Sequence, residues 1–246
     1  MIQPEERLAA AIAALILDPA APPARHIAVG AASPIPAAAC WLVRKMGHPV
    51  RLSLLHKRTG NPFTEGSREL FDLAGQGRID LFFLGGGQID GEANINLIGT
   101  GEWPGRAVRF PGSFGSAFMY MTVPRTILFR EEHSPRVLVP RVDMVSAPGL
   151  SPPGQFRRGT AQALVTGRCV FRFENGRFRL ASRHPGQSAA DIRANTGFDY
   201  DGEDAPETPD PGPEQLALLR GAVRAEMLET YPEFCARVWP QATAAA

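Results

Sequence analysis

The sequence predicts an α/β fold, with an open, mostly parallel sheet, helices on both faces, and mixed strands and a hairpin in the C-terminal half. Several short runs are apolar at nearly every position, which is typical of strands buried on both sides of a sheet. These runs cover residues 26–29, 50–55, 79–84, 126–129, 137–139 and 163–165. Helix-compatible stretches over residues 35–46 and 67–74 separate the first runs, and this alternation predicts βαβ units.

The C-terminal half carries the signals of a mixed sheet. From about residue 106 the strands follow one another with little room for helices. Residues 171–180 alternate apolar and charged side chains around Asn175 and Gly176, which predicts an antiparallel hairpin. Residues 201–213 are acidic and rich in proline, so we expect a solvated loop. Apolar side chains at helical spacing then predict an amphipathic helix over residues 214–231.

Composition limits the classes of function. The chain has 246 residues, of which 44% are hydrophobic and 21% are charged, as in a folded protein. We predict a single domain over residues 1–246. Lys and Arg number 26 against 25 Asp and Glu, which gives a net charge of +1 and disfavours a nucleic-acid partner.

Cysteine usage and hydropathy bear on location. Cys40, Cys169 and Cys235 lie far apart and form no CxxC pair, so they favour a reducing cytoplasm over a disulfide framework. We predict no metal site. The apolar run over residues 8–17 is too short to span a bilayer and follows acidic residues, so we expect a buried helix and no association with a membrane.

Two glycine-bearing loops could bind a ligand. The first, GGGQIDGEANIN, begins at Gly85 after a buried strand, and glycines there let a ligand reach main-chain N–H groups. The alternative is a tight exit from the strand. The second loop, FPGSFGSA, begins at Phe110 and offers small residues whose backbone donors could face an oxyanion or a phosphate.

The order of these motifs resembles that of the β subunit of family I CoA-transferases. The chain reads GRID, GGGQIDGEANIN, FPGSFGSA and REEH before PRVLV. The family reads roughly GALQVD-x-x-GN, PGxGGA and EHT before a PKI strand. The later pieces ALVTGRCVF, RHPG and DIRANTGF are similar to the family's ITDLAVF, APG and V-x-x-KTGxxF. The resemblance covers about residues 5–200 and is strongest to the glutaconate CoA-transferase branch.

The resemblance implies a sugar-phosphate isomerase and CoA-transferase type of fold, and a subunit that works beside a homologous α subunit as a heterodimer or heterotetramer. The substrate it implies is an acyl-CoA, whose CoA moves to or from a carboxylic acid. No separate cofactor is expected, because coenzyme A arrives as part of the substrate. The substrate- or CoA-binding residues that we predict are Gly85, Gly86, Gly87, Gln88, Gly112, Ser113 and Gly115.

One departure from the family concerns the nucleophile. The family carries a glutamate in an S-E-N-G turn after the second strand, whereas residues 50–60 of this chain contain no carboxylate. Glu65 is the nearest substitute, although it also fits an exposed carboxylate at a helix start. Relatives that lost the glutamate are hydrolases, carbon–carbon lyases or decarboxylases, in which the α subunit can supply a carboxylate. A non-catalytic structural subunit is a further alternative.

His56 and Glu132 complete the catalytic candidates. The His56 imidazole could activate a water or bind a substrate carboxylate, or it could belong to a solvated basic turn. Lys57 or Arg58 could instead pair with a carboxylate or a CoA phosphate. Glu132 and His133 match the family's EH pair, but neighbours on an extended strand point to opposite faces, so at most one would reach a shared site.

Overall fold

The computed structural model describes residues 1–57, 59–102, 104–105 and 107–240. The chain divides into two compact units. One comprises Met1–Gly66 together with Asp210–Ala246, and the other comprises Ser67–Pro209. The first unit is therefore built from both ends of the chain, and the second from its middle. The single domain over residues 1–246 stays a prediction.

The N-terminal part of the first unit alternates helix and strand, as the sequence predicts. Its elements are α1 (Pro4–Ile16), β1 (His26–Val29), α2 (Pro34–Lys45) and β2 (Arg51–Leu54). The strands β1 and β2 are parallel, with His26 opposite Arg51. Each helix begins with a proline in its first turn, where the missing N–H has no helical acceptor to lose.

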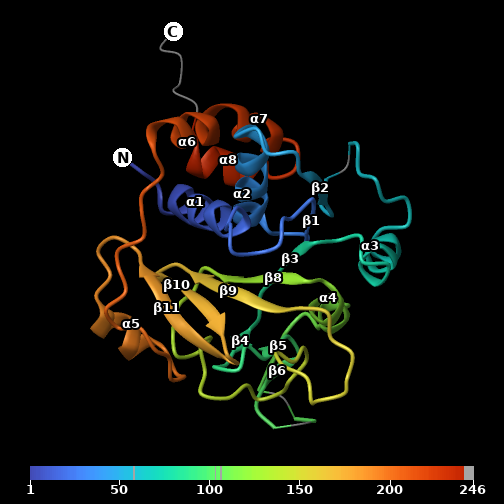
Figure 1. The fold of residues 1–246 in the computed structure, drawn as a ribbon, viewed down its shortest axis with the longest axis vertical. Coiled ribbons are helices and arrows are strands. Elements are labelled where there is room, and N and C mark those ends of the chain that lie inside the picture. The colour runs from blue at the N-terminus through green and yellow to red at the C-terminus, as the bar shows by residue number, and fades with distance from the viewer. Residues whose placement is uncertain (58, 103, 106, 241–246) are drawn as a thin grey trace. The chain divides into compact units, whose positions relative to one another are not determined.

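The C-terminal helices complete the first unit (Figure 1). They are α6 (Pro213–Leu218), the π turn η1 (Leu219–Val223), α7 (Arg224–Met227) and α8 (Pro232–Val238). The apolar spacing correctly identifies the buried face, because Leu219, Val223 and Met227 are fully buried. The run from α6 to α7 ends before residue 231, and a short turn precedes α8.

The second unit contains a five-stranded mixed arrangement in the order β11-β10-β9-β8-β3 (Figure 1). β3 pairs with β8 and β8 with β9 in parallel, whereas β10 pairs antiparallel with both β9 and β11. The sheet strands are β3 (Leu81–Leu84), β8 (Arg125–Arg130), β9 (Thr160–Thr166), β10 (Cys169–Glu174) and β11 (Arg177–Arg183). The protein is thus α/β, with parallel strands followed by an antiparallel hairpin, as predicted.

Short elements surround these strands. They are α3 (Ser67–Gly75), β4 (Gln88–Ile89), β5 (Ile95–Asn96), β6 (Gly99–Thr100), β7 (Val108–Arg109), α4 (Ser116–Thr122) and α5 (Ala189–Asn195). The pairs β4–β5 and β6–β7 are separate two-stranded antiparallel ladders. Both ladders lie in the segment that joins β3 to α4, which is the segment that carries the two glycine loops.

The predicted hairpin is confirmed as β10 and β11. Asn175 and Gly176 both have positive φ, at 52° and 80°, as a two-residue hairpin turn of type I′ requires. The strands bring Phe171 and Phe178 together in the core, with their ring centroids 5.9 Å apart. Both side chains are fully buried, so the alternating pattern correctly separates the inward aromatic residues from the charged ones.

Two expectations need correction. Residues 137–139 are buried but form no strand of the main sheet. Val137 O accepts from Ile89 N at 2.7 Å and Val139 N donates to Ile89 O at 3.0 Å, so the segment lies beside β4 instead. The loop over residues 201–213 is irregular but not simply solvated, because Asp201 and Glu207 form parallel bridges to β11. In the part of the chain that the structure describes, no helix is long and apolar enough to cross a membrane.

Candidate functional site

A cavity of about 390 Å³ lies where β3 ends, and we call it the glycine cavity. Its lining comes from the first glycine loop, from the β6–β7 ladder and Leu97 before it, from the start of the second loop, and from the end of β8 with the turn after it. The lining residues are Gly85, Gly86, Gly87, Leu97, Thr100, Val108, Phe110, Pro111, Phe129, Arg130, Arg136 and Val137. The wall is thus mainly apolar, with two arginines, which is the usual composition of a small-molecule site.

The three glycines are needed by packing as well as by the cavity. A Cβ on Gly85 would lie 2.8 Å from Phe129 O, and one on Gly86 would lie 2.7 Å from Gln88 O. A Cβ on Gly87 would overlap the Phe110 ring. The tight exit from the strand is therefore present at this loop, and the same three glycines line the cavity.

The backbone donors of the loop differ in their availability. Gly87 N donates to Asn96 O at 2.9 Å, which commits that N–H to the chain itself. The N–H groups of Gly85 and Gly86 make no hydrogen bond to any residue that the structure describes. Two adjacent residues that line the cavity therefore have backbone N–H groups without an acceptor among the described residues.

The second loop contributes its first residues to the cavity. Phe110 and Pro111 line it, whereas Gly112, Ser113 and Gly115 are not among its lining residues. Gly112 N donates to Leu97 O at 2.9 Å. The other two lie in the turn that begins α4, where Ser113 O accepts from Ser116 N. A binding role for these three residues stays a prediction.

The Gln88 side chain is hydrogen-bonded to other residues of the chain. Its side chain is 6% exposed, and its Oε1 accepts from Asn96 Nδ2 at 2.7 Å and from Asp143 N at 3.0 Å. These bonds join β4 to β5 and fasten the segment around residue 143 to the same ladder. The geometry therefore favours a structural role for this side chain over ligand binding.

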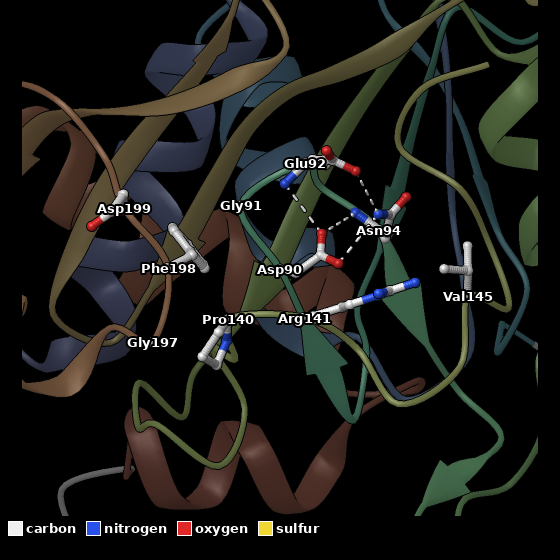
Figure 2. A pocket seen from close by; sticks show the side chains of 10 residues that line it. All are labelled: Asp90, Gly91, Glu92, Asn94, Pro140, Arg141, Val145, Gly197, Phe198 and Asp199. Carbon is white, nitrogen blue, oxygen red and sulfur yellow. Dashed lines mark hydrogen bonds between the residues drawn. The ribbon is translucent and has the colours of Figure 1, made fainter. Parts of the chain in front are cut away.

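A second cavity, of about 600 Å³, lies beside the turn between β4 and β5 (Figure 2). Asp90 is 4% exposed, and its carboxylate accepts from Glu92 N, Asn94 N and Asn94 Nδ2. Figure 2 shows this carboxylate turned toward Glu92 and Asn94. The acidic and amide residues of the GGGQIDGEANIN segment thus stabilise its turn through hydrogen bonds. This structural role explains why they are present without a catalytic one.

Glu132 lies in an ionic cluster beside the glycine cavity. Its Oε2 accepts from Arg136 Nη2 at 2.7 Å and from Arg130 Nη2 at 3.2 Å, and its Oε1 accepts from Ser134 Oγ at 2.8 Å. The hydrogen bond from Ser134 contributes most to lowering the pKa of Glu132, and the two arginines add to it against the effect of partial burial. The carboxylate is therefore ionised and well satisfied at neutral pH.

His133 points the other way, into the core of the second unit. It is 6% exposed, with Nδ1 2.8 Å from Thr166 Oγ1 and Nε2 3.0 Å from Thr196 Oγ1. Burial is the main cause that lowers the pKa of His133 to about 4, and the charge of Arg168 adds to it. Glu132 and His133 thus have different surroundings, although both lie beyond the end of β8 and not on the strand. That at most one of them reaches a shared site stays a prediction.

His56 and Glu65 belong to the first unit. His56 is exposed in the turn after β2, and its ring stacks on Tyr231 with centroids 5.6 Å apart. Lys57 Nζ lies 5.5 Å from the centre of the Trp41 ring, whereas Arg58 lies outside the described residues. Glu65 is exposed just before α3, as a helix-start carboxylate would be. Catalytic roles for His56 and Glu65 stay predictions.

Sequence reasoning missed Arg130 and Arg136. Both line the glycine cavity, and both contact Glu132. The signal was present in the run REEHSPR, in which one arginine precedes the acidic pair and another follows it. Only the turn after β8 brings the two side chains to the same carboxylate.

The chain is similar in sequence and in structure to known proteins. The B component of glutaconate CoA-transferase from Acidaminococcus fermentans is 34% identical over 149 residues, which are 57% of this chain and 55% of that protein. The IpdB component of the cholesterol ring-cleaving hydrolase from Rhodococcus jostii is 31% identical over 160 residues, 62% of each chain. The crystal structure of the decarboxylase AibA/AibB matches with a TM-score of 0.75 and 25% identity, over 92% of this chain and 98% of that chain.

These similarities differ in extent. The alignments span less than two thirds of the length of the two sequence relatives, whereas the structural match spans nearly the whole chain. The family model described as Coenzyme A transferase matches residues 43–195, which is more than half of the sequence. The chain belongs to the coenzyme A transferase family.

Proposed function

We propose that this chain is the β-type subunit of a heteromeric enzyme that acts on an acyl-CoA thioester. A homologous α subunit completes the site, in a heterodimer or heterotetramer. The similarity to the B component of glutaconate CoA-transferase, and to the two-component decarboxylase AibA/AibB, supports a heteromer. In this proposal the glycine cavity holds the thioester, with coenzyme A as part of the substrate and no further cofactor.

The observation that carries the proposal is the pair of uncommitted amides at Gly85 and Gly86. When a nucleophile attacks a thioester, negative charge develops on the carbonyl oxygen. Preorganised N–H donors stabilise that charge, typically by about 3 kcal/mol for each donor. The apolar wall from Leu97, Phe110 and Phe129 suits the acyl chain and excludes water from the reacting carbonyl.

The reaction that we propose first is transfer of CoA to or from a carboxylic acid. Hydrolysis, ring cleavage or decarboxylation is the second candidate, and the lack of a carboxylate in residues 50–60 favours it. In that case the α subunit supplies the carboxylate, and His56, Glu65 and Glu132 are the residues of this chain to vary. A purely structural role alongside an active α chain is the third candidate.

The proposal places the enzyme in the cytoplasm. Cys40, Cys169 and Cys235 are all buried and free, as expected of a protein that folds in a reducing compartment. Nucleic acid and membrane are not partners in this proposal, in line with the net charge of +1.

The deciding experiment uses the chain co-purified with its α partner. The complex is incubated with an acyl-CoA, with and without an acceptor carboxylic acid, and the new thioester, free CoA and released carbon dioxide are measured together. A new thioester that needs the acceptor supports transfer, whereas free CoA without acceptor or released carbon dioxide supports the second candidate. An intact complex that consumes no acyl-CoA would contradict the proposed function.

Trapping tests the nucleophile separately. Borohydride or hydroxylamine treatment during turnover modifies a glutamyl thioester, and mass spectrometry shows which chain carries the label. We expect no label on this chain, because its turn after β2 has no carboxylate. A labelled Glu65 would instead make that residue a displaced nucleophile and return this chain to ordinary transfer chemistry.

A further inference from the structure

The glycine cavity has a positively charged wall. A neutral acyl thioester bound in the cavity would offer these charges no partner. Arg130 ends β8 and Arg136 follows after a short turn, and both line the cavity. Glu132 contacts both guanidinium groups. Two positive charges and one negative charge leave this wall with a net charge of +1, next to side chains that are mainly apolar.

One N–H donor of the Arg130 guanidinium has no acceptor among the described residues. Its Nη2 donates to Glu132 Oε2, but its Nε is buried and has no acceptor within the described part of the chain. A buried donor without an acceptor costs about 1–3 kcal/mol. An anion that draws the guanidinium toward the cavity would remove this cost, so the unpaired Nε points to a ligand with acceptor oxygens.

Glu132 orients the pair. Its Oε2 accepts from both Arg130 Nη2 and Arg136 Nη2, and its Oε1 accepts from Ser134 Oγ. Among the described residues, its hydrogen-bond partners all lie within residues 130–136, at the end of β8 and in the turn that follows. A carboxylate held in this way restricts the rotamers of both arginines, which is how supporting groups usually prepare a binding site.

We propose that Arg130 and Arg136, oriented by Glu132, form an anion subsite of the glycine cavity that binds an anionic group of the acyl-CoA. Guanidinium groups bind carboxylate and phosphate oxygens in the same forked geometry. The anion is therefore either a second carboxylate on the acyl chain or a phosphate of coenzyme A. The proposal rests on the proposed function, because it assumes an acyl-CoA in this cavity.

The subsite would make the cavity selective. A ligand without the anion leaves Arg130 Nε unpaired, and sites built to pair a polar group reject ligands that lack it. Arg130 is then a specificity-determining residue, and Glu132 is a positioning residue that does not touch the reacting atoms.

The test compares three thioesters by isothermal titration calorimetry with the assembled complex. Succinyl-CoA carries a free carboxylate where butyryl-CoA has a methyl group, and butyryl-pantetheine lacks the phosphates of CoA. The variants are Arg130→Gln, Arg136→Gln and, as a control that also removes one exposed positive charge of the second unit, Arg141→Gln. Circular dichroism melting checks that each variant is folded.

Two outcomes support the subsite. If it binds an acyl carboxylate, Arg130→Gln weakens succinyl-CoA by about tenfold and leaves butyryl-CoA within about twofold. If it binds a phosphate, the variant weakens both CoA esters alike and leaves butyryl-pantetheine unchanged. We expect Arg136→Gln to follow the same pattern with a smaller loss, because its side chain is 78% exposed, and Arg141→Gln to match the wild type.

Two outcomes overturn the subsite. Equal affinity of Arg130→Gln and wild type for all three thioesters would show that no anion binds there. An equal loss for all three, including the neutral pantetheine ester, would show a structural defect. If the wild type binds none of the thioesters, the proposed function fails. The subsite is then judged by whether Arg130→Gln weakens the binding of succinate or adenosine 3′,5′-bisphosphate to the full chain.

Discussion

At the scale of single residues, neighbours in the sequence serve different purposes. Glu132 contacts two arginines of the cavity wall, whereas the adjacent His133 is buried between Thr166 and Thr196. Both residues lie just after the end of β8, and their side chains contact different groups. An acid next to a histidine therefore resembles a catalytic pair in the sequence, while the structure separates the two groups.

We predict that Glu132→Gln keeps kcat within about threefold of the wild type in the assembled complex. The carboxylate is already satisfied by Ser134, Arg130 and Arg136, so it is poorly placed to take a proton. Loss of a general acid or base typically lowers the rate by about 10²–10⁴. Steady-state kinetics would decide, and a fall of kcat in that range, with folding unchanged, would restore Glu132 as a catalytic residue.

His133 should make the protein less stable in mild acid. Its pKa is about 4 in the folded chain against about 6.5 when unfolded, so the unfolded state binds more protons between these values. The free energy of unfolding therefore decreases as the pH is lowered from 6.5 to 4. The shift corresponds to about 3 kcal/mol lost from pH 7 to pH 4. Urea denaturation at a series of pH values measures it. His133→Gln should show a shallower pH dependence, and an equal slope would refute the assignment.

At the scale of elements, the C-terminal helices are joined to α1 by a buried carboxylate. Glu6 is fully buried and accepts from Arg220 Nε at 2.7 Å and from Trp239 Nε1 at 3.1 Å. Burial alone would raise the pKa of Glu6, but the hydrogen bonds from Arg220, Gln3 N and Trp239 outweigh it and hold the pKa below its ordinary value. One side chain thus ties together segments from the two ends of the chain.

Replacing this carboxylate should loosen the first unit. We expect Glu6→Ala to lower the free energy of unfolding by about 2–4 kcal/mol, because it leaves the Trp239 N–H buried without an acceptor and removes the partner of Arg220. Arg7→Ala, which breaks the surface pair with Asp210, is the matched control and should cost less than about 1 kcal/mol. Chemical denaturation compares the two, and equal costs would contradict the argument.

At the scale of the whole molecule, each unit draws on a different part of the chain. The family match over residues 43–195 covers most of the second unit and only part of the first. The first unit depends on residues that follow position 209, because Leu219, Val223 and Met227 are fully buried in it. The C-terminal segment is therefore part of a core and not an appended tail.

Removal of residues 210–246 should expose the apolar face of α2. Hydrogen exchange of the truncated chain should show faster exchange at α2 amides, since burial against the C-terminal helices protects them. The β10–β11 hairpin, which lies in the other unit, should keep its protection. Unchanged exchange at α2 would mean that the core of the first unit does not need the C-terminal helices.

Local pattern determined much of this protein. Runs of apolar residues predicted β1, β2, β3, β8 and β9, and the Asn175 and Gly176 pair predicted the hairpin, because strand burial and turn conformation depend on residues close in sequence. The order of the glycine loops also indicated the family. The first glycine loop was expected after a buried strand, and the structure places it at the end of β3, where its three glycines line the cavity.

Only tertiary structure decided which groups are available. The sequence presents Gln88 and Glu132 as candidate site residues, but Asn96, Asp143 and two arginines already use them. It likewise presents residues 137–139 as a strand, whereas hydrogen bonds to Ile89 place them beside β4. The physical reason is that a polar group is free or committed according to its partners, and those partners are brought close by folding over distances that local pattern does not encode.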